Sequence, residues 1–485
     1  MKRAVCLWLL TLALGNPGTA RASEPVDRLL IEAATPEALR ARLLSHAAAV
    51  PDSGRVEKGE AWYYAGLSYD RDGLVDSAIV CYQQAYDQRG ETGERDALVD
   101  ALLLRDGPGD PARALALLRR PAAATELSTS WDPFDFDGRQ VWALYLGGQT
   151  DSALQLLHTM PASLYDERNP LGREWRYRAG LMELEHGDPT VAYVHLTPLA
   201  LASRLKDADV MQMMREIGDK TGAWSHLQTA MNRELAVRDR DELLMLNGLK
   251  ARRVRFQAED GFPLGGIVFA PSGSRRARAA VILLPHDIGF GTYDSLCTGL
   301  RRAGYASVLL ELRGAGGSVD RSCPLPGTWR GRETRMQSQV ARDVVFALRA
   351  LAMATPVDTT AYLVVGDGPT ASIAIEAAEL DPRVRLLVLL SPAPCPVDLG
   401  PSRARLEATR LPTFFEVPAE DMQSLPVADA WNRAADPRAS RVVESERVGH
   451  AAQVFRYDRE ALLRLRRWLD ETWLAGRGRA PRRSR

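Results

Sequence analysis

The chain has 485 residues, of which 46% are hydrophobic and 26% are charged. That balance is typical of globular proteins and excludes a disordered chain, and the length allows two or three domains. Lys+Arg and Asp+Glu number 62 each, so the formal net charge is zero. A global electrostatic attraction to nucleic acid or to an anionic membrane is therefore excluded.

Residues 1–22 are predicted to be a secretory signal peptide. Lys2 and Arg3 form a positive start before the apolar run 4–14, and Ala20-Arg21-Ala22 gives the small-x-small cleavage pattern before Ser23. The run is too short for a membrane-spanning helix, which needs about 20 apolar residues. We therefore expect an exported protein, periplasmic or secreted, with no transmembrane span.

Export changes the interpretation of the cysteines. Cys6 leaves with the signal, and the remaining cysteines show no Cys-x-x-Cys pattern for a metal. An oxidising compartment permits a disulfide. Cys323 and Cys395 fall in loops expected at the same end of a sheet, so they are the candidate pair. Buried free thiols are the alternative.

Residues 24–249 are predicted to form helical repeats. A glycine precedes an alanine by five residues four times, and the alanines lie 36, 39 and 39 residues apart. The glycine suits a left-handed helix end, and the alanine suits a close helix crossing. An aspartate near each turn is expected to start the next helix. The residues are Gly73, Asp76 and Ala78; Gly109, Asp110 and Ala114; Gly148, Asp151 and Ala153; and Gly187, Asp188 and Ala192.

The first of these units resembles a tetratricopeptide repeat. The matching residues are Trp62, Ala65, Gly66, Tyr69, Ala78, Tyr82 and Ala85, and Ala179, Gly180 and Ala192 repeat part of the pattern. The resemblance implies stacked helical pairs whose concave surface binds a peptide or a protein partner. The alternative is that the helices only pack against the rest of the chain.

Residues 250–475 alternate predicted strands and helices. The segments 254–258 and 266–269 flank the turn signal Glu259-Asp260-Gly261, which predicts a hairpin. Buried strands are predicted at 280–284, 306–310, 362–365, 386–390 and 413–417, with helices at 295–303, 337–352 and 372–380. The alternation predicts a mostly parallel sheet with helices on both faces. The basic tail 476–485 is expected to be disordered.

Residues 254–474 resemble the α/β-hydrolase superfamily. The segment 284–289 (LPHDIG) is similar to the L-H-G-x-G loop, and 311–318 (ELRGAGGS) is similar to D-x-R-G-x-G-x-S. Asp421 follows a predicted strand where the family's acid falls, and Gly449-His450-Ala451 is similar to its G-H-G. The resemblance implies an α/β-hydrolase fold with Asp421 and His450 as catalytic acid and base.

The nucleophile of that family is missing from the expected turn. The family has G-x-S-x-G there, and counting back from the turn at Asp381 places Gly368 where the serine should be. Pro369 follows and has no N–H to donate to an oxyanion. In the other oxyanion loop, Asp287 replaces a glycine beside Ile288. We interpret these departures as loss of the serine-hydrolase mechanism.

Two alternative nucleophiles remain open. Asp367 would serve if the turn shifted by one residue, and Ser372 has small residues around it. The leading hypothesis is a non-catalytic, hydrolase-like protein that binds a ligand or a protein, and the alternative is an ester or amide hydrolase. Whether the chain is an enzyme is left open. No cofactor, metal or nucleic acid is predicted.

Overall fold

The computed structural model describes residues 23–119, 133–160, 165, 170–271, 276–285, 289–320, 332–445 and 451–476. The predicted signal peptide and residues 477–485 of the tail lie outside them. The chain forms two compact units. The helical unit takes in Met1–Arg240, Gly314–Met336 and Cys395–Gly400, and the α/β unit takes in Asp241–Arg313, Gln337–Pro394 and Pro401–Arg485.

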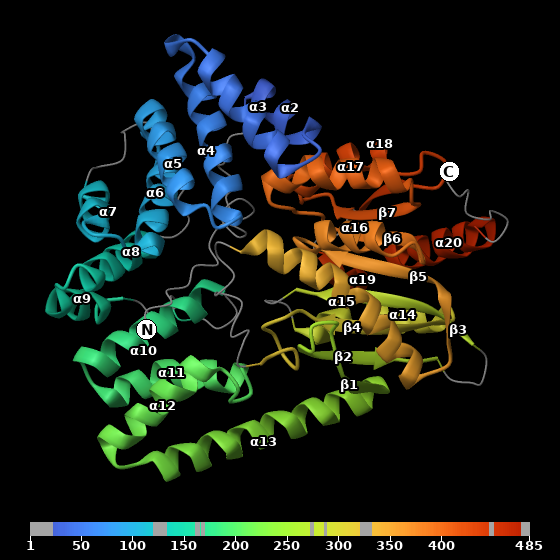
Figure 1. The fold of residues 1–485 in the computed structure, drawn as a ribbon. Coiled ribbons are helices and arrows are strands. Elements are labelled where there is room, and N and C mark those ends of the chain that lie inside the picture. The colour runs from blue at the N-terminus through green and yellow to red at the C-terminus, as the bar shows by residue number, and fades with distance from the viewer. Residues whose placement is uncertain are drawn as a thin grey trace. The chain divides into compact units, whose positions relative to one another are not determined.

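The first part of the chain is helical, as predicted (Figure 1). Consecutive helices pack as neighbours along most of this region. The helices are α2 (Glu24–Glu32), α3 (Pro36–Ala49), α4 (Arg55–Arg71), α5 (Val75–Arg89), α6 (Thr92–Arg105), α7 (Asp110–Leu118), α8 (Pro133–Leu146), α9 (Thr150–Leu157), α10 (Pro170–His186), α11 (Pro189–Ala202), α12 (Ala208–Thr221) and α13 (Trp224–Leu249). Helix α13 ends at Leu249, where the boundary was predicted, but the two compact units divide within this helix, between Arg240 and Asp241.

The turn glycines follow the prediction at three of four positions. Gly73, Gly109 and Gly148 have φ values of +78°, +84° and +76°. The prediction is wrong for Gly187, which has no positive φ. The alanine that follows each glycine is buried as predicted, because the alanines at 78, 114, 153 and 192 are all fully buried. Of the four predicted helix-starting aspartates, Asp188 is an N-cap that accepts a hydrogen bond from the N–H of Thr190, whereas the other three lie within the first turn of their helices.

Glycines allow close helix crossings in this unit, and two of them share the same spacing to their partner. A Cβ on Gly66 of α4 would lie 2.7 Å from the Tyr82 ring of α5, and one on Gly180 of α10 would lie 2.5 Å from Leu196 of α11. In both cases the partner lies 16 residues further along the chain. The same sequence spacing therefore gives the same contact in two helix pairs. In each pair, a glycine without a side chain lets the two helices approach closely.

We expect Gly66→Ala to destabilise the helical unit. The added methyl overlaps a rigid ring, and overpacking typically costs about 1–3 kcal/mol, which exceeds the helix propensity gained. Gly93→Ala on α6 is the matched control, since a Cβ there meets nothing within 4 Å. Its free energy of unfolding should rise by roughly 0.5 kcal/mol. Urea unfolding of both variants checks the opposite signs.

The described part of the α/β unit contains an eight-stranded sheet in the order β1-β2-β4-β3-β5-β6-β7-β8. Both partners of β2 are antiparallel to it, and all other pairs are parallel. The predicted hairpin and strands are confirmed, and the structure adds the last strand, which sequence analysis missed. The strands are β1 (Ala251–Gln257), β2 (Pro263–Phe269), β3 (Ala277–Leu284), β4 (Tyr305–Glu311), β5 (Val357–Asp367), β6 (Val384–Leu390), β7 (Thr413–Pro418) and β8 (Arg441–Ser445).

Helices cover both faces of this sheet, as the unbroken apolar strands require (Figure 1). Ile282 and Val365 on one face join a core with Leu296 of α14 and Trp468 of α20. On the other face, α16 packs against β3, β5 and β6. The helices that accompany the strands are α14 (Asp294–Arg302), α15 (Glu333–Ala354), α16 (Thr370–Leu380), α17 (Leu399–Thr409), α18 (Ser424–Ala434), α19 (Val454–Tyr457) and α20 (Arg459–Gly476).

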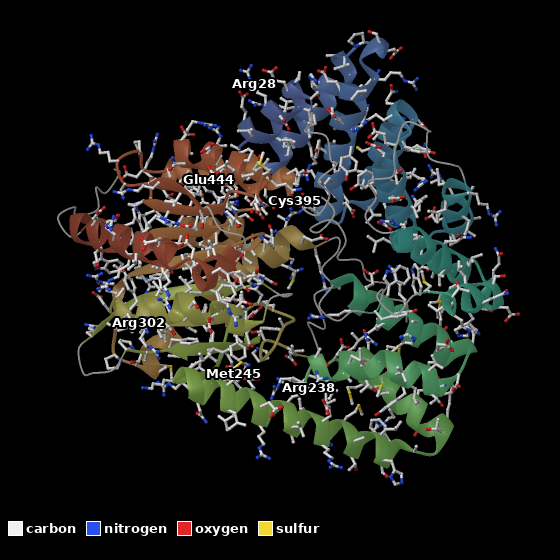
Figure 2. The ribbon with its side chains drawn as sticks, turned by 180° about the vertical axis from the view of Figure 1, so that it is seen from behind. Arg28, Arg238, Met245, Arg302, Cys395 and Glu444 are labelled. Carbon is white, nitrogen blue, oxygen red and sulfur yellow. The ribbon has the colours of Figure 1, made fainter. Side chains whose placement is uncertain are left out.

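The segment Cys395–Gly400 follows β6 in the sequence but packs within the helical unit. Asp398 accepts a 2.7 Å ion-paired hydrogen bond from Arg71 of α4, which is 3% exposed. Cys395, labelled in Figure 2, is a buried free thiol. The predicted disulfide partner Cys323 lies outside the described residues. The structure therefore holds Cys395 in the free-thiol alternative and not in a bridge.

Among the described residues, no helix combines the length and the apolar character that crossing a bilayer demands.

Candidate functional site

The turn between β5 and α16 has the geometry of a nucleophile elbow. Gly368 has φ +53°, so the chain makes a left-handed turn directly after the strand. A Cβ on Gly366 would lie 2.8 Å from both the Ala371 Cα and the Thr370 carbonyl oxygen. In G-x-S-x-G the first glycine is likewise two residues before the nucleophile, at a sharp strand-to-helix turn. The crowding at Gly366 therefore sets Gly368, and not Asp367, at the tip of the turn.

Gly368 leaves this tip without a side chain. Its N–H donates to the Leu390 carbonyl at 2.9 Å, and its carbonyl accepts from the N–H of Ala393 at 3.1 Å. These bonds fix the turn against the end of β6. A Cβ built on Gly368 meets no described atom within 4 Å. The position is thus rigid in the backbone and open where a nucleophilic side chain would project.

Pro369 follows the tip and precedes the first residue of α16. A proline suits the start of a helix, because the first turn leaves backbone donors without partners anyway. It has no N–H, however, so the usual second donor of an oxyanion hole is absent. The other predicted oxyanion positions, Asp287 and Ile288, lie outside the described residues.

The Asp367 side chain, one residue before the tip, is buried and accepts hydrogen bonds from two described donors. It is 1% exposed, and its Oδ2 accepts hydrogen bonds from the Tyr293 hydroxyl at 2.6 Å and from the Ala452 N–H at 3.0 Å. Tyr293 ends the short helix η3 (Phe290–Tyr293), and Ala452 lies in η6 (Ala451–Gln453). The Asp367 carboxylate, at the end of β5, therefore connects the segments that follow β3 and β8.

A buried serine provides a second anchor for η6. Ser391, just after β6, is fully buried, and its Oγ accepts a hydrogen bond from the Ala451 N–H at 3.0 Å. Together with Asp367 it fixes two successive backbone amides. The predicted base His450 immediately precedes this pair of amides but lies outside the described residues. The two side-chain acceptors therefore hold the chain at the first described residues after His450.

Ser372 and Asp421 both have structural partners. Ser372 lies in the first turn of α16, is 5% exposed, and donates its hydroxyl to the Pro369 carbonyl at 3.2 Å. Asp421 follows β7, and its Oδ1 accepts from the Ser424 N–H at 3.0 Å at the start of α18. Ser372 is thus within a helix and not at the tip, whereas Asp421 occupies the loop after β7 that the resemblance predicted.

Glu416 is a buried carboxyl that sequence analysis did not single out. It lies within β7 and is 1% exposed, with Oε1 3.3 Å from Nη2 of Arg464. The same guanidinium nitrogen lies 3.2 Å from Asp458. Burial raises the pKa of Glu416 to about 7, against the opposing charge of Arg464. A single acidic residue in the apolar run 413–417 was the signal available in the sequence.

The raised pKa of Glu416 gives a signed prediction for stability. The pKa of Glu416 is higher in the folded than in the unfolded protein. Its contribution to the free energy of unfolding is therefore fully present below about pH 4 and is lost as pH rises through 7. In the wild type, this titration should lower the free energy of unfolding by roughly 2–3 kcal/mol between pH 5 and pH 8. Glu416→Gln should abolish that decrease. Urea unfolding at both pH values measures it.

The control for this prediction is Glu444→Gln on the neighbouring strand β8, where the glutamate is exposed (Figure 2). Its pH dependence should match the wild type. An identical pH dependence in wild type and Glu416→Gln would contradict the assignment.

The described ranges contain no cluster of three histidine, cysteine or acidic side chains arranged to hold a metal ion.

No protein-family model matches the chain. A curated relative, the thiohydrolase apmlB of Arthrinium phaeospermum, is 29% identical over 159 residues. The match spans 32% of this chain and 48%, about half, of that relative.

Solved structures similar to the chain include AbyA5, with 16% identity, a TM-score of 0.38 and coverage of 67% of this chain and 95% of that one. Another is the esterase domain of a Rhodothermus marinus protein, with 12% identity, a TM-score of 0.35 and coverage of 45% and 97%. The fold of the second unit is therefore assigned from its own sheet. The order of its strands, the parallel pairing from β4 to β8 and the left-handed turn after β5 give the second unit an α/β-hydrolase fold.

Proposed function

We propose that the chain is an exported binding protein whose α/β-hydrolase unit has lost covalent catalysis. The observation that carries the proposal is Gly368, a residue without a side chain at the left-handed tip after β5. A nucleophile must project from this tip to attack an acyl group, and glycine provides none. The two nearest substitutes do not project there, because Asp367 is bonded to Tyr293 and Ala452, and Ser372 is bonded within α16.

The site would bind a ligand at the carboxyl ends of the strands. That edge is where open α/β sheets generally hold their ligands. The free space beside Gly368 supports this location, since no described atom approaches a Cβ there within 4 Å. The amides of Ala451 and Ala452 support it as well, because their hydrogen bonds anchor η6 to the ends of β5 and β6.

The helical unit is proposed to bind a peptide or protein as tetratricopeptide-like repeats do. The equivalent crossings at Gly66 and Gly180 support the repeat, because the same spacing gives the same close approach in two helix pairs. A surface of stacked helix pairs is suited to extended partners. The export signal before Ser23 would place both units outside the cytoplasm.

Hydrolysis of an ester or thioester is the second candidate function. The likeness to a thiohydrolase favours it. It requires a nucleophile other than serine at the tip, and Asp367 is the nearest carboxylate. Because Asp367 is 1% exposed and accepts two hydrogen bonds, it would first have to be released from Tyr293 and Ala452.

The two functions are separated by assays on the mature wild-type protein and on His450→Ala. Both are incubated with a panel of short-chain acyl esters and acyl thioesters. The binding proposal expects equal, background-level rates in the two proteins. Turnover by the wild type that disappears in His450→Ala would overturn it and establish the hydrolase, with Asp367→Asn as the next variant.

A further inference from the structure

The residue that follows the predicted cleavage point lies against a buried carboxylate. The backbone nitrogen of Ser23 donates to Oε2 of Glu60 at 2.6 Å, and Glu60 of α4 is only 5% exposed. The Ser23 carbonyl accepts from the Asp27 N–H at 2.9 Å, so Ser23 also begins α2. The first residue of the expected mature chain is therefore tied to a helix 37 residues away.

The nearest guanidinium to Glu60 is shared with other carboxylates. Arg89 of α5 lies 3.9 Å from Oε1 of Glu60 but 2.9 Å from Glu94, and it also bonds Glu91. An amide at Ser23 brings one donor and no charge to this acidic group. A free amino terminus would bring three donors and a positive charge, which suits a buried carboxylate far better.

We propose that cleavage between Ala22 and Ser23 creates an α-ammonium group that forms a buried ion pair with Glu60 and locks α2 onto α4. Two independent observations concern the backbone nitrogen of Ser23. The sequence places a cleavage pattern before Ser23, and the structure places the Ser23 nitrogen on a buried carboxylate. Further along α2, Arg28, labelled in Figure 2, is exposed and pairs with Glu32 one turn later.

The ion pair makes the amino terminus less reactive than a free one. An α-amino group ordinarily has a pKa near 8, and a carboxylate at hydrogen-bond distance raises it. The carboxylate on the Ser23 nitrogen is that of Glu60, whose guanidinium neighbour Arg89 also pairs with Glu91 and Glu94. Because Arg89 is shared among three carboxylates, Glu60 is left to hold the protonated amine against the positive end of the α2 dipole.

The test uses the full chain exported by a bacterial host. Amino-terminal sequencing should begin at Ser23. At pH 7.5, the terminal amine of the folded protein should be acylated about tenfold more slowly than that of Glu60→Gln, which is one unit of pKa. Glu57→Gln is the matched control one turn earlier on α4, where the glutamate contacts His46 instead, and it should react as the wild type does.

A different first residue, or equal acylation rates in wild type and a folded Glu60→Gln, would overturn the proposal. Should Glu60→Gln fail to fold, a chain with one extra alanine before Ser23 keeps Glu60 and moves the ammonium away from it. Its terminal amine should then react as fast as that of an unstructured peptide. Protection equal to that of the Ser23 chain would count against the ion pair.

Discussion

Replacing Gly368 with serine should make the α/β unit react with a fluorophosphonate, whereas the wild-type chain should remain unlabelled. The new hydroxyl would project from the tip of the turn into space that no described atom occupies. The left-handed φ of +53° imposes a cost on any residue with a Cβ, about 1–2 kcal/mol of stability. Labelling should be slow, because Pro369 has no N–H for the oxyanion, a loss of roughly 10²–10³ in rate.

The control is Gly368→Ala, which carries the same backbone cost without a hydroxyl and should not be labelled. The double variant Gly368→Ser with Pro369→Ala restores the missing N–H and should be labelled about a hundredfold faster than the single variant. Intact-mass spectrometry follows the reaction. Labelling of the wild type at the rate of the double variant would mean that a nucleophile elsewhere in the chain performs the chemistry.

The position of Gly368 was predictable because the relevant signals are local. Asp381 ends α16, and counting back along one helix fixes the turn before it. The buried strands were predictable for a similar reason, since fully covered strands read as continuous apolar runs. β8 was missed because four of its five residues are exposed or half-exposed, so its sequence has neither an apolar run nor a clean alternation.

The contacts that organise the site were not predictable from the sequence. Asp367 meets Tyr293 across 74 residues and Ala452 across 85 residues, and nothing local to Asp367 indicates either partner. Gly187 shows the same limit on a smaller scale. It fits the repeat pattern, but a Cβ on it would lie 2.1 Å from the Glu183 carboxylate, and its backbone is not left-handed. Spacing alone cannot separate these two reasons for a glycine.

Replacing Asp367 with alanine should destabilise the α/β unit strongly, by about 3–5 kcal/mol. The change leaves the buried Tyr293 hydroxyl and the Ala452 N–H without the acceptor that now joins them. Asp367→Asn keeps the shape and one acceptor oxygen, so its cost should be smaller, near 1–3 kcal/mol. Ser372→Ala, a buried serine bonded only within its own helix turn, is the control and should cost about 1 kcal/mol or less.

Hydrogen exchange distinguishes a clamp from a nucleophile at Asp367. In the clamp, the amides of Ala451 and Ala452 should exchange faster in Asp367→Ala, and Ser391→Ala should accelerate the Ala451 amide by removing its own acceptor. A nucleophile predicts instead that Asp367→Asn abolishes turnover while the exchange of these amides stays unchanged. The choice between the two roles is therefore experimental, because losing the clamp changes the exchange of these amides whereas losing a nucleophile changes turnover.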